Sequence, residues 1–199
     1  MSVIAAVTDG TRAYMAADSR LSLDDLILQQ HPASQQKVAR LGNGVLVGLA
    51  GYAGLCAALL GDLTCENPWP DPEPWAQRSA EGFEVYLEER GPQLRAFMAA
   101  WATDSPHGAE ETDAFEALVA CGPTIARLTS DGGITIHAQP YFAIGSGQMI
   151  ALGALGALLA VDTPAAVAVR LAVDMACRHV AACGPPVVLV CSEEAADAE

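Results

Sequence analysis

Short apolar runs separated by tight-turn residues occupy the start of the chain, and this pattern is typical of β-strands. Residues 2–7 are small or β-branched and lead to Asp9-Gly10, a dipeptide that favours a hairpin turn. Residues 11–17 then return as a second apolar segment. The pattern therefore predicts a β-hairpin at this end of the chain.

A second hairpin is predicted after a polar stretch over residues 18–36. Pro32 argues against a continuous helix in that stretch, so we interpret it as a loop. The strands of the second hairpin are expected over 37–41 and 45–49, around a Gly-Asn-Gly turn whose residues tolerate positive φ. Four strands are thus predicted in the first quarter of the chain.

The middle of the chain changes to a helical pattern. Residues 52–63 are rich in alanine and leucine, and residues 75–101 carry apolar side chains at helical spacing. Gly91-Pro92 is expected to divide or kink the second of these helices. The proline-rich residues 67–74 and the polar residues 104–112 are predicted as loops.

Strand patterns return in the last part of the chain and give way to two helices. Three short strands are predicted, at residues 115–121, 124–129 and 134–139. A helix is expected over 148–161, in a segment rich in alanine, glycine and leucine.

Thr163 and Pro164 are expected to begin the next helix as N-cap and first-turn proline, and this helix should run to about Ala182. A glycine and two prolines stop it, residues 187–191 form a final strand, and the acidic tail at 192–199 is expected to be mobile. This element order fits an α+β fold in which two sheets lie between helix layers.

Composition and charge fit one globular domain over residues 1–199. Hydrophobic residues make up 52% and charged residues 17%, which is enough apolar material for a core. The net charge is −14, and the ten cationic residues are scattered, so nucleic acid is not an expected partner. Glycines interrupt the most apolar segment, 144–161, so we expect no membrane span.

Six cysteines are interpreted as reduced thiols. The N-terminal residues lack the pattern of a secretory signal peptide, so a cytoplasmic location is expected. The spacing Cys177-x-His179-x3-Cys183 matches none of the common zinc patterns. We therefore expect neither a metal nor a cofactor, and we interpret the cysteines as small buried apolar residues.

A single lysine, Lys37, stands against nine arginines. A lysine ammonium can shift its pKa when it is buried, whereas a guanidinium stays charged, so a lone lysine is a candidate for proton chemistry. The alternative is a surface lysine left by chance.

Ser2 follows the initiator Met1, and removal of Met1 would leave an α-amine beside the serine hydroxyl. An α-amine titrates near pH ~7.7–8.0, so it can act as a general base at neutral pH. One residue could then supply both nucleophile and base. Serine after methionine is common, so this feature carries weight only in combination with others.

Five short stretches supply that combination, and they lie at residues 1–7, 16–20, 37–41, 47–51 and 142–147. Together they resemble the proteasome β-subunit and HslV-like family of N-terminal-nucleophile (Ntn) hydrolases. In order, they are similar to the family segments that carry the nucleophilic threonine, an acidic residue, a lysine, the oxyanion hole and an accessory serine. The resemblance implies a four-layer αββα sandwich, with two antiparallel sheets between helix layers.

The resemblance also implies a role for each matching residue. Ser2 would be the nucleophile, and Lys37 would lower the pKa of its amine by like-charge repulsion. Asp18 would hold the lysine in a hydrogen-bonded pair. The simpler interpretation of Asp18 alone is a turn cap.

The remaining two roles fall at strand ends. Gly51 is the candidate oxyanion donor, with Gly48 as the alternative if the register is shifted. Ser146 would hydrogen-bond near the amine and help to position it. Taken alone, Ser146 is more simply interpreted as a helix N-cap.

The chain departs from the family pattern at several positions. Serine replaces threonine as nucleophile and lacks the methyl group that restricts the threonine side chain. His179 and Ala182 align with a supporting aspartate and serine of the proteasome, and Leu55 stands where the family commonly has an aspartate. His179 could take over part of the supporting role, although a helix-end histidine without special function is the simpler interpretation.

Three functions are compatible with these residues. The resemblance favours an Ntn peptidase that acts on peptides or unfolded proteins in a homo-oligomeric ring, with an ATP-dependent unfoldase as a possible partner. A catalytically inactive shell subunit is the first alternative, because fold does not guarantee function. An amidase that acts on a small amide is the second.

Overall fold

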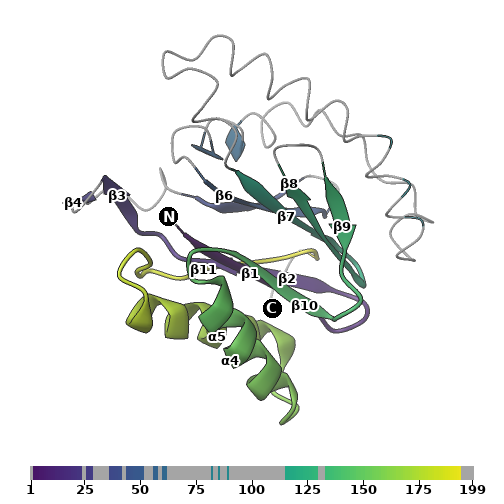
Figure 1. The fold of residues 1–199 in the computed structure, drawn as a ribbon. Helices are drawn as coiled ribbons and strands as arrows, with labels where there is room; N and C mark the ends of the chain where they lie inside the picture. Colours follow the sequence, from purple (N-terminus) through teal and green to yellow (C-terminus); the bar gives the residue numbers. More distant parts are fainter. Residues whose placement is uncertain are drawn as a thin grey trace, which may run out of the picture.

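Two antiparallel sheets lie face to face in the computed structural model of this protein (Figure 1). The structure describes residues 2–23, 26–28, 36–41, 44–51, 56–57, 60–61, 82, 85, 89, 115–129 and 133–193. The predicted α+β sandwich with two antiparallel sheets is confirmed.

The first sheet has the strand order β10-β1-β2-β11. Its strands are β1 (Val3–Thr8), β2 (Ala13–Ala17), β10 (Tyr141–Gly145) and β11 (Val188–Cys191). β1 pairs with β2 on one side and with β10 on the other, so that Ile4 lies opposite both Ala17 and Ile144. Every residue of β1 is buried, which explains why its sequence is an almost continuous apolar run.

The second sheet follows the chain in the order β5-β6-β7-β8-β9. Its strands are β5 (Val38–Arg40), β6 (Leu46–Ala50), β7 (Glu116–Cys121), β8 (Thr124–Thr129) and β9 (Ile134–Ile136). A separate small hairpin is formed by β3 (Leu21–Leu23) and β4 (Leu26–Leu28).

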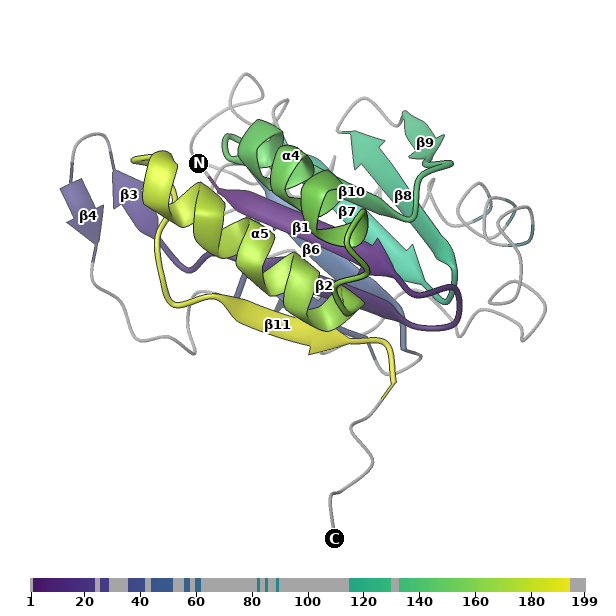
Figure 2. The ribbon, with the colours of Figure 1, turned by 90° about the horizontal axis from the view of Figure 1, so that it is seen from below.

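Helices α4 (Gln148–Leu159) and α5 (Ala165–His179) cover the outer face of the first sheet, as Figure 2 shows. The buried face of α5 consists of small and β-branched residues at helical spacing, namely Ala168, Val169, Ala172, Val173 and Ala176. Small side chains let the helix lie close to the sheet. Within the described part of the chain, no helix is long and apolar enough to span a bilayer.

Alternate residues of β1 enter two different cores, as expected for a strand with a period of two. Val3, Ala5 and Val7 pack under the helices, whereas Ile4 and Ala6 lie between the two sheets. The two sheets are in close contact at Gly48, where an added Cβ would lie 2.6 Å from the Cγ2 atom of Ile4. This position therefore requires glycine for packing.

The outer face of the second sheet is also covered. Cys56 and Leu60, both helical, are buried against β6 and β7 in a cluster that includes Val47, Leu49 and Val119. The helix predicted over 52–63 is thus present at its described residues. The rest of it, most of the helix predicted over 75–101, and the two predicted loops lie outside the described residues.

Several element predictions need correction. The stretch predicted as a loop over 18–36 contains the β3–β4 hairpin, and residues 141–145, for which no strand was predicted, form β10. α5 begins after Pro164, which is itself the N-cap, and it ends at His179 rather than near Ala182. β9 ends at Ile136. β10 is set by its pairing with β1, a partner distant in sequence that local propensity does not report.

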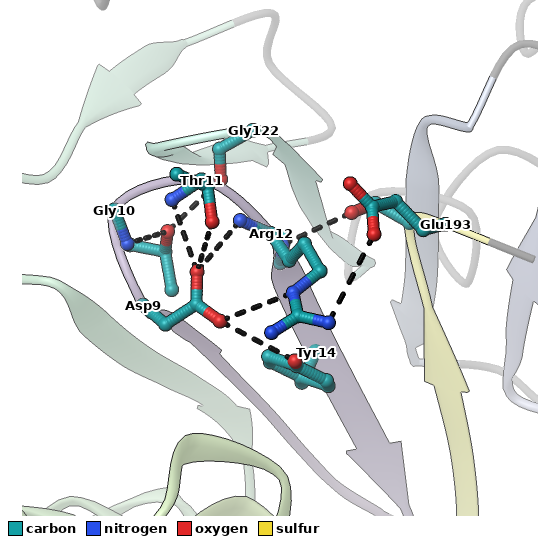
Figure 3. Close-up of polar contacts among 10 residues, drawn as sticks. Asp9, Gly10, Thr11, Arg12, Tyr14, Gly122 and Glu193 are labelled. Atoms are coloured by element: carbon teal, nitrogen blue, oxygen red, sulfur yellow. Dashed lines mark hydrogen bonds and ion pairs between the residues drawn. The ribbon is translucent and has the colours of Figure 1, made fainter. Parts of the chain in front are cut away.

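The turn between β1 and β2 is organised by Asp9 (Figure 3). Its Oδ1 atom accepts hydrogen bonds from the backbone N–H groups of Thr11 and Arg12 and from the Thr11 hydroxyl, at 3.0, 2.8 and 2.8 Å. Its Oδ2 atom accepts from Arg12 Nε and from the Tyr14 hydroxyl, both at 3.3 Å. Although partial burial raises the pKa of Asp9, these donors outweigh it and lower the pKa to about 2.

Asp9→Asn is expected to lower the free energy of unfolding by about 0.5–1 kcal/mol at pH 7, because the turn is largely exposed and solvent screens the lost charge. The folded pKa lies below the unfolded value, so this contribution is present above pH ~4 and is lost as the pH falls toward the folded value. Urea unfolding of both proteins at pH 7, 4 and 3 measures it. A difference that stays constant with pH would contradict the assignment to the carboxylate charge.

Candidate active site

Ser2 immediately precedes β1 and is buried. Its carbonyl oxygen accepts hydrogen bonds from Ser146 Oγ at 3.2 Å and from the Gly147 N–H at 3.3 Å. Gly145, at the end of β10, has φ +86°, and an added Cβ would collide with the Ser2 carbonyl. Glycine at this position therefore allows Ser146 to approach Ser2.

Asp18 follows β2, and its side chain is fully buried, with an exposed fraction of 0%. Its Oδ1 atom accepts hydrogen bonds from the Val3 N–H at 3.0 Å and from Lys37 Nζ at 2.8 Å. Its Oδ2 atom accepts from the backbone N–H groups of Arg20 and Gly184, at 3.1 and 3.0 Å. The Arg20 contact is a turn cap, as the simpler interpretation expected, but the other three donors are distant in sequence. Four donors therefore satisfy both oxygens of this buried carboxylate.

Lys37 immediately precedes β5, and its side chain is only 12% exposed. Besides Asp18, its Nζ atom donates to the carbonyl oxygen of Arg20 at 2.7 Å. An ammonium has three protons, and these two contacts use two of them. The lone lysine of the chain is therefore a nearly buried member of an ion pair, and the interpretation as an incidental surface residue is wrong.

The peptide unit that joins Ser2 to Val3 is held from both sides. Its N–H belongs to Val3 and donates to Asp18, while its carbonyl belongs to Ser2 and accepts from Ser146 and Gly147. Since a peptide unit is planar, fixing both groups fixes its orientation. The structure thus brings Ser2, Asp18, Lys37 and Ser146 together around one peptide unit.

Comparisons with known proteins relate this arrangement to one fold. No family model and no curated protein matches the sequence. Among solved structures, Thiobacillus denitrificans BPH in complex with epoxomicin is similar, with a TM-score of 0.73 and 19% identity over 95% of this chain and 97% of that chain. Eukaryotic HslV from Trypanosoma brucei is similar with a TM-score of 0.67 and 21% identity, over 95% of this chain and 98% of that chain. This chain has the HslV-like Ntn-hydrolase fold. A second structure of Thiobacillus denitrificans BPH is similar over 98% of this chain and all of that chain, with a TM-score of 0.70 and 21% identity.

Within the HslV-like fold, the end of β6 lies beside Ser2. A Cβ added to Gly145 would collide with the Ser2 carbonyl and would also lie 3.4 Å from the Ala50 side chain. Ala50, the residue before Gly51, is therefore close to the Ser2 carbonyl. Gly51 itself directly follows β6 and is half-buried. Gly48 is different, because it pairs with Val38 and Leu118 in mid-sheet and is required there for packing. Gly51 remains the candidate oxyanion donor, and the alternative at Gly48 has no support in this geometry.

The end of α5 and the segment after it differ in their contacts with the site. His179 is exposed, and the contacts come instead from Cys183 and Gly184, which are both buried. Cys183 Sγ lies 3.9 Å from Ser146 Oγ, and the Gly184 N–H donates to Asp18. The sequence signal for Gly184 was present, but we interpreted it only as a helix stop.

Arg20 is a further residue that the sequence analysis missed. Its Nη1 atom donates to the Ala181 carbonyl at 2.6 Å, and its guanidinium lies so close to Gly184 that any Cβ there would collide with it. The Ser19 N–H also donates to the Gly184 carbonyl, at 3.0 Å. Arg20 therefore attaches the segment after α5 to the strand end that carries Asp18.

Ser146 is not the N-cap of α4. The N-cap is Gly147, without a side-chain cap, and the Ser146 hydroxyl is directed to the Ser2 carbonyl instead. The simpler interpretation of this serine is therefore wrong, and its contact with Ser2 requires another explanation.

Cysteine thiols near the site are poorly suited to be nucleophiles. Burial raises the pKa of Cys56 to about 11 and that of Cys177 to about 12, and in Cys177 the charge of Asp18 adds to the effect. Burial and then Asp18 also raise the pKa of Cys183. A thiol attacks as its thiolate, so these side chains stay protonated and unreactive at neutral pH. Among the described residues, no group of three or more His, Cys, Asp or Glu side chains could hold a metal ion.

Proposed function

We propose that this chain is an Ntn peptidase whose nucleophile is Ser2 after removal of Met1. The observation that carries the proposal is the Ser2–Val3 peptide unit, which Asp18 and Ser146 hold from opposite sides beside the only lysine of the chain. Ser2 lies just before β1, and a buried ion pair that holds the next N–H is more than the start of an ordinary strand requires. The HslV-like fold adds support from an independent direction.

The first half of the reaction forms an ester. The Ser2 α-amine, directly or through a water molecule, accepts the hydroxyl proton while Oγ bonds to the carbonyl carbon of the substrate. The Gly51 N–H donates to the oxygen that becomes negative. When this intermediate collapses, the C–N bond breaks and the leaving amine takes the proton from the Ser2 ammonium.

The second half of the reaction restores the enzyme. Water gives a proton to the Ser2 amine and attacks the ester carbonyl, and collapse of the new intermediate returns the proton to Ser2 Oγ as the carboxylic acid leaves. Lys37 assists both halves because its positive charge lowers the pKa of the neighbouring amine, which keeps that amine available as a base. Asp18 fixes the ammonium in place through the 2.8 Å contact.

Peptides or unfolded proteins are the proposed substrates, and a homo-oligomeric ring is the proposed assembly. Both follow from similarity to HslV and not from a contact within this chain. An ATP-dependent unfoldase is the corresponding proposed partner. Native mass determination tests the ring, and a monomer at micromolar concentration would contradict it.

Removal of Met1 is the condition on which the mechanism depends. The intact mass of the purified protein is expected to correspond to a chain that begins at Ser2. Epoxomicin, the ligand in one Thiobacillus BPH structure, is expected to add one molecule per chain. Ser192→Ala should leave that addition unchanged, because Ser192 Oγ accepts from the Ala13 N–H at the far end of β2.

Retention of Met1 in the active preparation would contradict the proposal, since the amine would then be separated from the hydroxyl by a peptide bond. A mature Ser2 terminus that neither reacts with epoxomicin nor turns over any peptide would favour the inactive shell subunit.

A further inference from the structure

We propose that Cys183 is a positioning residue for Ser146, and that its thiol orients the serine hydroxyl toward the Ser2 carbonyl. This inference rests on the proposed function of Ser2. Cys183 contacts neither the substrate nor the nucleophile in this scheme. It acts through Ser146, which it reaches from the segment that follows α5.

The direction of the contacts follows from the donors available. Ser146 Oγ lies 3.2 Å from the Ser2 carbonyl oxygen and 3.9 Å from Cys183 Sγ, the latter within hydrogen-bonding distance for sulfur. A carbonyl oxygen can only accept, so the single hydroxyl proton of Ser146 is used toward Ser2. The Cys183 S–H must therefore be the donor to Ser146 Oγ. The result is a short relay from thiol to hydroxyl to carbonyl.

The thiol is in the protonation state that this relay requires. Cys183 has an exposed fraction of 0%, and burial together with the charge of Asp18 raises its pKa. The hydrogen bond with Ser146 acts in the opposite direction and does not overcome them. Cys183 thus keeps its proton at neutral pH and remains a donor.

Packing leaves the sulfur little freedom to move. A Cβ on Gly147 would lie 3.1 Å from Cys183 Sγ and 2.7 Å from Val3 Cβ, so glycine at 147 makes room for the thiol against β1. The next residue, Gly184, donates its N–H to Asp18 and accepts from the Ser19 N–H. One dipeptide therefore contacts both supports of the Ser2–Val3 peptide unit, Ser146 through its side chain and Asp18 through its backbone.

The test compares Cys183→Ala with Cys183→Ser in the full-length mature protein. Cys183→Ala removes the donor and is expected to lower kcat by about threefold to tenfold with little change in KM, the effect of one lost hydrogen bond. Cys183→Ser restores an O–H donor and is expected to recover most of the lost kcat. A role in packing alone predicts no such recovery.

Cys121→Ala is the matched control. Cys121 is a buried thiol at the end of β7, in the cluster on the outer face of the second sheet, and its loss removes the same volume from a core. This variant is expected to lower the melting temperature while leaving kcat unchanged. Wild-type kcat in Cys183→Ala, or a Cys183→Ser variant as slow as Cys183→Ala, would overturn the inference.

Hydrogen exchange gives a second readout that does not depend on turnover. The Gly147 N–H donates to the Ser2 carbonyl beside Ser146, so its exchange is expected to be faster in Cys183→Ala and restored in Cys183→Ser. If wild-type protein shows no Ser2-dependent turnover, the proposed function fails and the exchange rates alone decide the inference. Equal Gly147 exchange in wild type and Cys183→Ala would then overturn it.

Discussion

Ser2→Ala is expected to lower peptide hydrolysis by about 10³-fold or more, because it removes the atom that forms the covalent intermediate while leaving the fold intact. The hydrogen bonds between Ser2 and other described residues are accepted by its backbone carbonyl, and alanine keeps that carbonyl. Turnover of a panel of fluorogenic peptides by both proteins measures the effect. Circular dichroism and the melting temperature are expected to be unchanged.

Two further variants make this result specific. Ser2→Thr keeps a hydroxyl and adds a methyl group that restricts χ1, so it should stay within about tenfold of wild type. Ser192→Ala removes a serine hydroxyl at the other end of the first sheet and should leave turnover unchanged. Peptide hydrolysis that survives in Ser2→Ala would assign the activity to a contaminant or to another residue, and would contradict the proposed nucleophile.

The fold was predictable where local sequence and tertiary structure agree. The hairpin β1–β2 was visible because Asp9-Gly10 both ends an apolar run and makes the turn, and the observed strands follow the predicted ones within two residues. β10 was missed because its pattern resembles the start of a helix, and only pairing with β1 shows it to be a strand. The β3–β4 hairpin was missed for a different reason: its two short strands lie within a stretch that was interpreted as a polar loop.

The candidate site shows a similar division. Ser2, Asp18, Lys37 and Ser146 were selected with the help of a family resemblance. In the structure Lys37 and the Val3 N–H donate to Asp18, and Ser146 donates to the Ser2 carbonyl, so that all four lie around the Ser2–Val3 peptide unit. The contacts of Cys183 and Gly184 were not predicted, because no alternation or motif sets the register of the segment after a helix. Cys183 has no sequence signature, because a cysteine in a core position cannot be distinguished from any other small apolar residue in the sequence. Only the structure shows that its Sγ atom lies 3.9 Å from Ser146 Oγ.

The ion pair between Asp18 and Lys37 has a cost that a purely structural role would not explain. Removing two charges from water is unfavourable, and a buried pair is often no more stabilising than apolar residues of similar volume. Here the three backbone N–H groups that donate to Asp18 come from the start of β1 at Val3, from the Arg20 turn and from Gly184, so the carboxylate joins three separate segments. Under the proposed mechanism the pair would position the peptide unit that joins Ser2 to Val3, which gives a reason for charged residues where apolar ones could pack.

Lys37→Arg is expected to lower kcat by about 10²-fold or more while preserving the net charge and the fold. The Nζ atom makes contacts of 2.8 and 2.7 Å, and the Lys37 side chain is only 12% exposed. A planar, larger guanidinium cannot reproduce both contacts and leave a compact charge next to the Ser2 amine. Steady-state kinetics on a fluorogenic peptide, with unfolding in urea as the measure of stability, tests the change.

Two controls distinguish charge from shape at this position. Arg40→Lys makes the reverse exchange on β5, where Arg40 Nε donates to the Ser192 carbonyl at 3.0 Å, and it should leave kcat unchanged. Lys37→Met leaves Asp18 without its counter-charge and is expected to cost about 3–5 kcal/mol of stability as well as activity. If Lys37→Arg retained near-normal turnover, charge alone would be sufficient beside Ser2, and the compact geometry of the ammonium could not be the reason for a lysine at this position.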